Sequence, residues 1–337
     1  MTLISNGLRA VLAAVLCCMA LGAIAAPSVA QTTPQQPSTA VTWGVIPSSA
    51  DGPTGRTAFE YLLDPGESVT DWLGVSNYGY QDLELEIYAT DAFTTPEGGF
   101  DLLAANRPPS DVGSWVEFGV ETIVVPARSR TDLPFRLTVP PNATPGDHVG
   151  GAIAAYVTET DGAEGTVRLD RRIASRIYLR VAGDLNPQLA IESLRADFTD
   201  TLVPFGPGTL SLSYTVTNTG NVRMSGPTTL TISGPLGIGL RPVEVGALPD
   251  LLPGNSLDFV TVIDDVAPLI FLDLTLRIDP SAPGLGNVES VAATTQVWAI
   301  SAVGFGLVAV LLVAALWFWW SRRRQRLADR RAETEEE

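Results

Sequence analysis

Apolar and polar residues alternate with a period of two along much of the chain between residues 41 and 290. This alternation is typical of β-strands that bury one face and expose the other. The clearest stretches lie at residues 83–88, 133–139, 177–181, 210–216 and 272–279. Because no amphipathic helix of useful length is indicated between the two ends of the chain, we predict an all-β fold for this region.

Turn-forming residues separate these stretches at the spacing of a β-sandwich. They lie at Pro65-Gly66, Asn77-Tyr78-Gly79, Pro145-Gly146, Asn218-Thr219-Gly220, Gly234-Pro235 and Pro253-Gly254. Each half of the chain has an Asn-x-Gly turn after a strand. Each half also has a Pro-Gly turn before a strand, at Pro65 and at Pro253. The repetition predicts two tandem immunoglobulin-like β-sandwiches, over residues 41–182 and 187–290.

The first 30 residues have the three parts of a secretory signal. A polar start with one positive charge precedes the apolar residues 10–26, and Ser28-Val29-Ala30 places small residues at the −3 and −1 positions of a cleavage site. We therefore predict a signal peptide over residues 1–30. Residues 31–40 are rich in Pro, Gln and Thr, which predicts a flexible leader.

Two alternatives concern this N-terminal segment. An uncleaved membrane helix would use the same apolar run, which is shorter than the roughly 20 residues that cross a bilayer comfortably. Lipidation at Cys17 or Cys18 would need a small residue before the modified cysteine, but Leu16 precedes Cys17. Cleavage after Ala30 removes both cysteines, so the mature chain would have no disulfide and would depend on its core for stability.

Residues 298–320 form an uncharged run of 23 residues with tryptophans at both ends. The run is long enough to cross a bilayer, and tryptophans favour the two membrane interfaces. Arginines follow at residues 322–324, and arginines beside a span stay in the cytoplasm. We predict a transmembrane helix over 298–320 and a cytoplasmic tail over 321–337, in a single-pass type I protein of the plasma membrane. A sortase-type anchor is the alternative, but no LPxTG-like pentapeptide precedes the run.

The predicted ectodomain is strongly acidic. All 21 basic residues of the chain are arginine, which suggests a high-GC genome. Without Arg9 and the charged residues of the tail, 14 arginines and 32 acidic residues remain, a net charge of −18. Such a surface repels phosphate backbones, so we expect no nucleic-acid partner. Solubility alone is the alternative explanation for the acidity.

Six short segments of the first half resemble a known family in their order. They are Val41–Val45, Leu63–Ser68, Val75–Gly79, Tyr88–Ala92, Gly98–Phe100 and Val139–Gly151. Residues 41–182 thereby resemble the first domain of the WxL-interacting protein family of Gram-positive surface proteins. The layout of signal, two sandwiches, one span and a basic tail is also similar to that family. The resemblance implies a first domain that binds peptidoglycan and a second that binds a protein. Residues 187–290 match the family's second domain only in fold class, so we name no protein partner.

The sequence offers little for catalysis. His148 is the only histidine, lysine is absent, and no Gly-x-Ser-x-Gly elbow is present. Nothing singles out a pair among the 32 ectodomain acids, so a glycan hydrolase is a remote alternative. We predict a protein that is not an enzyme, with no cofactor and no metal site. Calcium at an acidic loop, near Asp161, Glu164 and Asp170 or at Asp264-Asp265, stays open.

Aromatic side chains are the first candidates for ligand binding. Tyr78 and Tyr80 bracket a turn, and Trp115 lies in or beside a strand. Aromatic rings can stack on sugars, but Trp115, like Trp72, is also well suited to a sandwich core.

Arginines are the second candidates. Arg172 and Arg176 lie on the same face of a predicted strand, where they would meet an anionic wall polymer or offset nearby acids. The sequence thus predicts a non-catalytic cell-surface protein that binds peptidoglycan or an associated polymer through its wall-facing ectodomain. The alternative is an adhesion or scaffold module that holds a surface or secreted protein.

Overall fold

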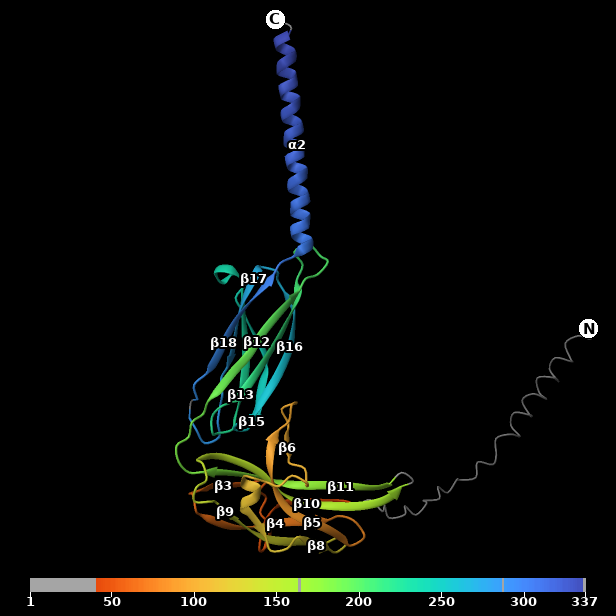
Figure 1. The fold of residues 1–337 in the computed structure, drawn as a ribbon, viewed down its shortest axis with the longest axis vertical. Helices are drawn as coiled ribbons and strands as arrows, with labels where there is room; N and C mark the ends of the chain where they lie inside the picture. The colour runs from red at the N-terminus through yellow and green to blue at the C-terminus, as the bar shows by residue number, and fades with distance from the viewer. Residues whose placement is uncertain (1–40, 163–164, 287, 336–337) are drawn as a thin grey trace, which may run out of the picture. The chain divides into compact units, whose positions relative to one another are not determined.

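The computed structural model describes residues 41–162, 165–286 and 288–335, which consist mostly of β-strands followed by one long helix (Figure 1). The predicted all-β class is confirmed for this part of the chain. The predicted signal peptide and leader lie outside the described residues. Two pairs of sheets follow each other along the chain, and we call them the first sandwich (residues 43–181) and the second sandwich (residues 189–299).

Two facing sheets make up the first sandwich. Its strands are β1 (Trp43–Ser49), β2 (Gly52–Pro53), β3 (Phe59–Leu63), β4 (Ser68–Asn77), β5 (Leu83–Thr94), β6 (Phe100–Leu102), β7 (Val116–Phe118), β8 (Thr122–Val125), β9 (Arg130–Thr138), β10 (Gly146–Gly162) and β11 (Gly165–Val181). One sheet has the order β2-β1-β4-β9-β7; the other has β3-β11-β10-β5-β6, with β8 also on β5. Alternating residues of both sheets, including Leu73, Leu85 and Phe135, meet in one core.

The second sandwich has its own core, which includes Leu212, Leu230 and Leu274. Its strands are β12 (Leu189–Thr199), β13 (Gly208–Asn218), β14 (Met224–Ser233), β15 (Arg241–Leu251), β16 (Ser256–Val266), β17 (Ile270–Ile278) and β18 (Val291–Ala299). They form the sheets β12-β13-β16 and β15-β14-β17-β18. The first, second and fifth strands therefore share one sheet, as in immunoglobulin-type sandwiches.

The Asn-x-Gly turns have the same structure in both sandwiches. Asn77 and Asn218 are buried at the ends of β4 and β13. Each side-chain amide donates to at least two backbone carbonyl groups, and each side-chain oxygen accepts a hydrogen bond from the glycine N–H two residues on. The repeat seen in the sequence therefore corresponds to a repeated set of buried contacts.

Each of the two Pro-Gly turns precedes a strand, as predicted, but the two turns do not occupy equivalent places in the two sandwiches. Pro65-Gly66 precedes β4, whereas Pro253-Gly254 precedes β16. The buried asparagines show the true equivalence, because their backbone N–H groups donate to Ser129 and Asn255. The counterpart of Gly254 is thus Arg128, and both residues have positive φ, 71° and 57°. The same turn is built from different residue types, so sequence pattern alone missed it.

The C-terminal helix α2 (Ala302–Glu335) begins later than the predicted start at Trp298. Residues 298 and 299 instead belong to β18, where they pair with Phe271 and Ile270 of β17. Ser301 then starts the helix, since its hydroxyl accepts a hydrogen bond from the N–H of Gly304. The stretch Ala302–Arg324 is long and apolar enough to cross a membrane.

Candidate binding face on the first sandwich

The outer face of the β3-β11-β10-β5-β6 sheet carries apolar side chains that are buried outside the main core. Strand β11 points Ile177 and Leu179 into the core, so its even-numbered residues face outward. On this outer face, Ile153 of β10 and Leu102 of β6 are both buried. Together with Ala155 they form a separate small apolar cluster. The face is therefore covered in part and is not an ordinary solvated surface.

Arg172 and Arg176 border a hollow in this face. The hollow has a volume of about 240 Å³, and Phe100, Leu102 and Ile153 also line it. The guanidinium group of Arg176 lies over the Phe100 ring, 4.7 Å from its centroid. Arg172 is held by a 2.8 Å hydrogen bond from its Nη1 to a backbone carbonyl, that of residue 103. Two cationic groups are thus fixed beside an aromatic ring at the edge of one hollow.

Within the described part of the chain, no ion pair joins Arg172 or Arg176 to an acid, although Asp101 lines the same hollow and the charge of Asp250 interacts with that of Arg176. Arg180, farther along the same face of β11, differs in this respect. Its Nε and Nη2 donate to the two carboxylate oxygens of Asp147 at 2.6 and 2.9 Å. Among the described residues, Arg172 and Arg176 therefore differ from Arg180 in having no direct ion-pair partner.

Tyr88 supplies a buried hydroxyl to the same face, next to the Arg172 guanidinium. Its hydroxyl is buried, and it has no hydrogen-bond partner of good geometry among the described residues. Burial raises the pKa of Tyr88, and the nearby Arg172 guanidinium acts in the opposite direction. A buried hydroxyl without a partner is uncommon, and a bound ligand or water is one way to satisfy it.

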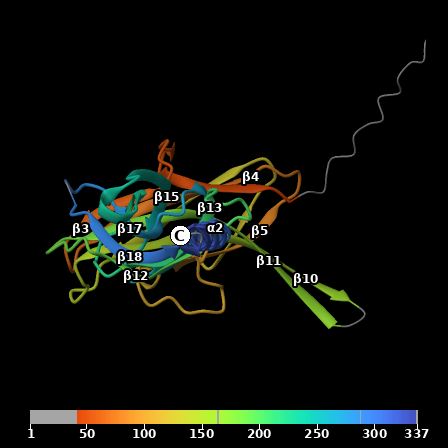
Figure 2. The ribbon, with the colours of Figure 1, turned by 90° about the horizontal axis from the view of Figure 1, so that it is seen from above.

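Figure 2 shows that β10 and β11 project together beyond the other strands of their sheet. Their pairing runs from Gly146 opposite Val181 to Gly162 opposite Gly165. Pairing with β5 is confined to residues 150–155 of β10. The hairpin therefore extends the sheet on the side of Arg172.

The predicted tyrosines lie elsewhere. Tyr78 is exposed, and its ring lies over the backbone of Gly44 in β1. Tyr80 is also exposed and stacks with Arg128, whose guanidinium carbon is 4.2 Å from the ring centroid. The structure thus brings Arg172 and Arg176 together but does not bring the two tyrosines to them. Sequence reasoning missed Tyr88 and Phe100. The alternation along β5 could have indicated Tyr88, because it lies on the same outward face as Glu84 and Glu86.

Trp115 and His148 support each other and the core. Trp115 lies in the short 3₁₀ helix η1 (Val112–Trp115), half-buried against the core, with its ring centroid 4.8 Å from that of His148. His148 Nδ1 lies 2.6 Å from an Asp111 carboxylate oxygen, and Nε2 lies 2.8 Å from the carbonyl oxygen of Thr144. Both ring nitrogens face acceptors, which suits an imidazolium that holds loops together.

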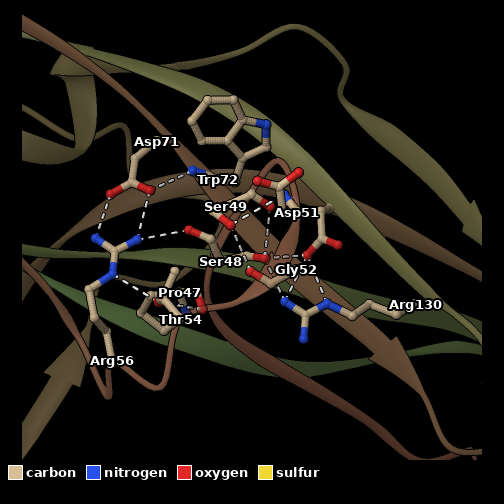
Figure 3. Close-up of polar contacts among 11 residues, drawn as sticks. Pro47, Ser48, Ser49, Asp51, Gly52, Thr54, Arg56, Asp71, Trp72 and Arg130 are labelled. Carbon is tan, nitrogen blue, oxygen red and sulfur yellow. Dashed lines mark hydrogen bonds and ion pairs between the residues drawn. The ribbon is translucent and has the colours of Figure 1, made fainter.

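A second polar cluster, in the other sheet of the first sandwich, is satisfied internally (Figure 3). The carboxylate of Asp71 accepts two hydrogen bonds from Arg56, at 2.7 and 2.8 Å. Arg130 donates both to Ser48 Oγ, at 2.6 Å, and to Asp132. Burial raises the pKa of Asp71, but the hydrogen bonds from Arg56 and Tyr61 outweigh it and leave that pKa below its ordinary value. The donors and acceptors of this cluster are used in holding the fold.

No group of three or more His, Cys, Asp or Glu side chains in the described residues is arranged to hold a metal ion. The side chains of Asp161 and Glu164, named in the calcium hypothesis, lie outside the described part. Asp264 accepts a hydrogen bond from Thr209, and its neighbour Asp265 accepts one at its backbone oxygen from Arg241. The hypothesis of calcium at an acidic loop gains no support from these contacts.

No protein-family model matches the chain, and no curated protein matches it. Solved structures with a similar fold include the class 5 fimbriae chaperone CfaA, which is 11% identical with a TM-score of 0.39, over 75% of this chain and 99% of that one. The CupB2 chaperone of Pseudomonas aeruginosa is 12% identical with a TM-score of 0.29, over 73% and 99%. The E. coli chaperone DraB is 9% identical with a TM-score of 0.31, over 75% and 96%. Similarities this distant carry no argument about ligand or partner.

Proposed function

We propose that this protein is a membrane-anchored, non-catalytic binding protein whose first sandwich holds a cell-wall polymer on the face that carries Arg172 and Arg176. In this proposal the ectodomain consists of two tandem immunoglobulin-like domains and faces the wall. The signal at residues 1–30 is removed, α2 spans the plasma membrane, and the tail after it lies in the cytoplasm.

The observation that carries the proposal is the pair of arginines beside Phe100, neither of which has an ion-pair partner among the described residues. A guanidinium group pairs well with a carboxylate or phosphate, and an aromatic ring offers a surface on which a sugar can stack. The Tyr88 hydroxyl adds a hydrogen-bonding group. Carboxylates and sugars occur together in peptidoglycan.

The net charge of the ectodomain favours one class of wall polymer over another. Because the net charge of the predicted ectodomain is −18, its surface repels a dense polyanion at long range. A ligand with few, widely spaced negative groups is repelled much less. The proposal is therefore that peptidoglycan, which carries isolated carboxylates, is bound in preference to a polyphosphate-type wall polymer.

Retention on purified cell wall tests the proposal. The full chain in detergent is mixed with insoluble peptidoglycan, with polyphosphate polymer removed in one arm and left attached in another. Arg172→Gln/Arg176→Gln removes both charges and should weaken retention about tenfold or more, because a charge-assisted hydrogen bond contributes about 1.5–3 kcal/mol.

The controls separate a lost ligand contact from a lost fold. Arg176→Gln alone keeps the hydrogen bond of Arg172 to the backbone and should weaken retention by a smaller factor. Arg136→Gln changes an exposed arginine of β9, on the other sheet, and should have no effect. Absence of retention of the wild-type chain, or equal retention of all variants, would refute the proposal.

One observation favours the alternative of a protein partner. Strand β16 is the edge of its three-stranded sheet, and it exposes Val260 and Val262, at 77% and 59%. Exposed edge strands with apolar side chains are sites at which a partner strand can add. Crosslinking in cells should then capture one stoichiometric protein from the wild-type chain and none from Val260→Lys/Val262→Lys.

A further inference from the structure

Three connections of the second sandwich lie at the end from which α2 leaves. They are residues 200–207, residues 234–240, which include the short 3₁₀ helix η2 (Pro235–Gly237), and residues 267–269. The strand register fixes their place, because Ser233 pairs with Asp273 and Ile270 pairs with Ala299. Residues 233, 270 and 299 therefore mark one end of the four-stranded sheet.

Apart from Asp200, these connections are apolar, uncharged and exposed. Residues 201–208, 234–240 and 266–272 contain no Asp, Glu, Lys or Arg, although the ectodomain as a whole is strongly acidic. Leu202 is 89% exposed, and the Leu236 side chain is fully exposed. Further exposed apolar side chains at this end are Val203, Phe205, Ile238, Leu240, Ile270, Trp298 and Ile300. At the opposite end, residues 184–188, 219–223 and 279–290 include charged side chains.

The first of these connections packs against the beginning of α2. The backbone N–H of Phe205 donates to Ser301 Oγ at 3.1 Å, and the carboxylate of Asp200 accepts from the N–H of Ala302 at 2.8 Å. The Phe205 ring lies edge-on to that of Phe305, with centroids 6.1 Å apart. The ring also fills the space beside Gly304, where a Cβ would lie 2.8 Å from it. Residues 200–207 are thus held against the first turns of α2.

Only Ile300 and Ser301 separate β18 from α2. The end of the second sandwich therefore has no long linker between it and the helix. Wherever the apolar helix enters a bilayer, the exposed apolar loop of residues 200–207 beside its first turn reaches the same bilayer surface. Residues 234–240 lie at the same end of the second sandwich. Aromatic side chains such as Trp298 favour this interface.

We propose that the apolar end of the second sandwich, formed by residues 201–208 and 234–240 with Trp298, lies in the headgroup region of the lipid bilayer beside α2. This inference rests on the proposed membrane anchor. The charged groups closest to the loops are Asp200 at the start of the first loop, Arg241 at the start of β15, and Asp264 and Asp265 near the end of β16. Lipid headgroups and water can solvate them there. The second sandwich is then held on the membrane surface and does not stand away from it on a stalk.

Lipid quenching of site-specific labels tests the inference on the full chain in phosphatidylcholine vesicles. Cys17→Ser/Cys18→Ser leaves a single introduced thiol as the only one. A polarity-sensitive fluorophore is attached at Leu202→Cys, Leu236→Cys, Val310→Cys or Val260→Cys in four separate variants. All four positions are exposed, so labelling does not disturb a core. A nitroxide on carbon 5 of the lipid acyl chain is the quencher.

The label at position 310, within α2, reports whether the helix is in the bilayer, and the label at 260, in the middle of β16, is the matched control outside it. We expect labels at 202 and 236 to be quenched about twofold or more relative to 260, with blue-shifted emission. Quenching at 310 with 202 and 236 no different from 260 would overturn this inference and leave the membrane anchor intact. Absence of quenching at 310 would overturn the anchor itself.

A protein could cover the loops in place of lipid. In that case the emission at 202 and 236 would be blue-shifted without quenching by the lipid nitroxide. That result would also overturn the inference, and repeating it at a tenfold lower protein-to-lipid ratio would show whether a second copy of the chain is responsible.

Discussion

At the scale of single residues, His148 is held by contacts that its residue type alone does not suggest. His148 is the only histidine of the chain, and its two ring nitrogens are used by Asp111 and by the Thr144 backbone. Burial lowers the pKa of His148, but the hydrogen bond and charge of Asp111 outweigh burial and leave that pKa above its ordinary value. The residue therefore acts as a charged link between loops of the first sandwich.

The raised pKa of His148 predicts a pH-dependent stability. Because the folded-state pKa exceeds the ordinary value, the stabilisation is fully present below about pH 6.5 and is lost as the pH rises through the folded-state pKa. Between about pH 5.5 and pH 8.5, the thermal midpoint of the wild-type chain should fall more than that of His148→Gln. Asp111→Asn should reduce the pH dependence in the same way. Parallel curves for the three proteins would contradict the assignment.

At the scale of elements, both sandwiches share one turn, which follows β4 in the first sandwich and β13 in the second. The buried amides of Asn77 and Asn218 connect the end of one strand to the backbone of the following turn and of a strand farther along the chain. These amides satisfy carbonyl groups that would otherwise be buried without partners. The turn therefore depends on the asparagine side chain, and in the second sandwich also on Gly220, where a Cβ would collide with the backbone oxygen of Asn186.

Asn77→Ala and Asn218→Ala should each destabilise their sandwich. Removing the amide leaves at least two carbonyl groups without a donor, which costs about 2–4 kcal/mol. Urea unfolding of the full chain in detergent, followed by tryptophan fluorescence, measures the change. Asn142→Ala removes an exposed asparagine and should change stability by less than about 0.5 kcal/mol. Equal stability of Asn77→Ala and Asn142→Ala would refute the role of the buried amide.

At the scale of the whole molecule, Asp147 links the two sandwiches. Its carboxylate accepts from Arg180 and also from the backbone N–H of Arg223, at 2.9 Å. Arg180 in turn donates to the carbonyl oxygen of Pro283, at 2.6 Å. The Asp147 side chain is only 7% exposed, so its charge depends on these donors.

Asp147→Ala should loosen the link between the sandwiches without unfolding either core. Spin labels at Glu121→Cys and Glu244→Cys, both exposed positions, report the distance between the sandwiches. In a chain without its two native cysteines, the distance distribution should become about twofold wider in Asp147→Ala, because domains without a fixed interface move relative to each other. Asp184→Ala, an exposed acid near the connection, serves as the control. An unchanged distribution would show that other contacts hold the sandwiches.

The sequence by itself determined the all-β class and the apolar C-terminal helix. Period-two alternation reflects burial of one strand face, and a long uncharged run reflects length and composition alone, so both can be read locally. The parity of β11 likewise placed Arg172 and Arg176 on one face. The predictions of a signal peptide, a wall ligand and membrane orientation stay predictions.

The tertiary structure decided what those local patterns leave open. Phe100 joins Arg176 because β6 folds beside the outer face, and Arg128 replaces a glycine in a turn that only the hydrogen bonds of Asn77 identify. Trp298 belongs to a strand because β17 supplies its pairing partner. Each of these features depends on contacts between segments far apart in the sequence. A local pattern of apolar and polar residues does not indicate which distant segment a strand or loop will contact.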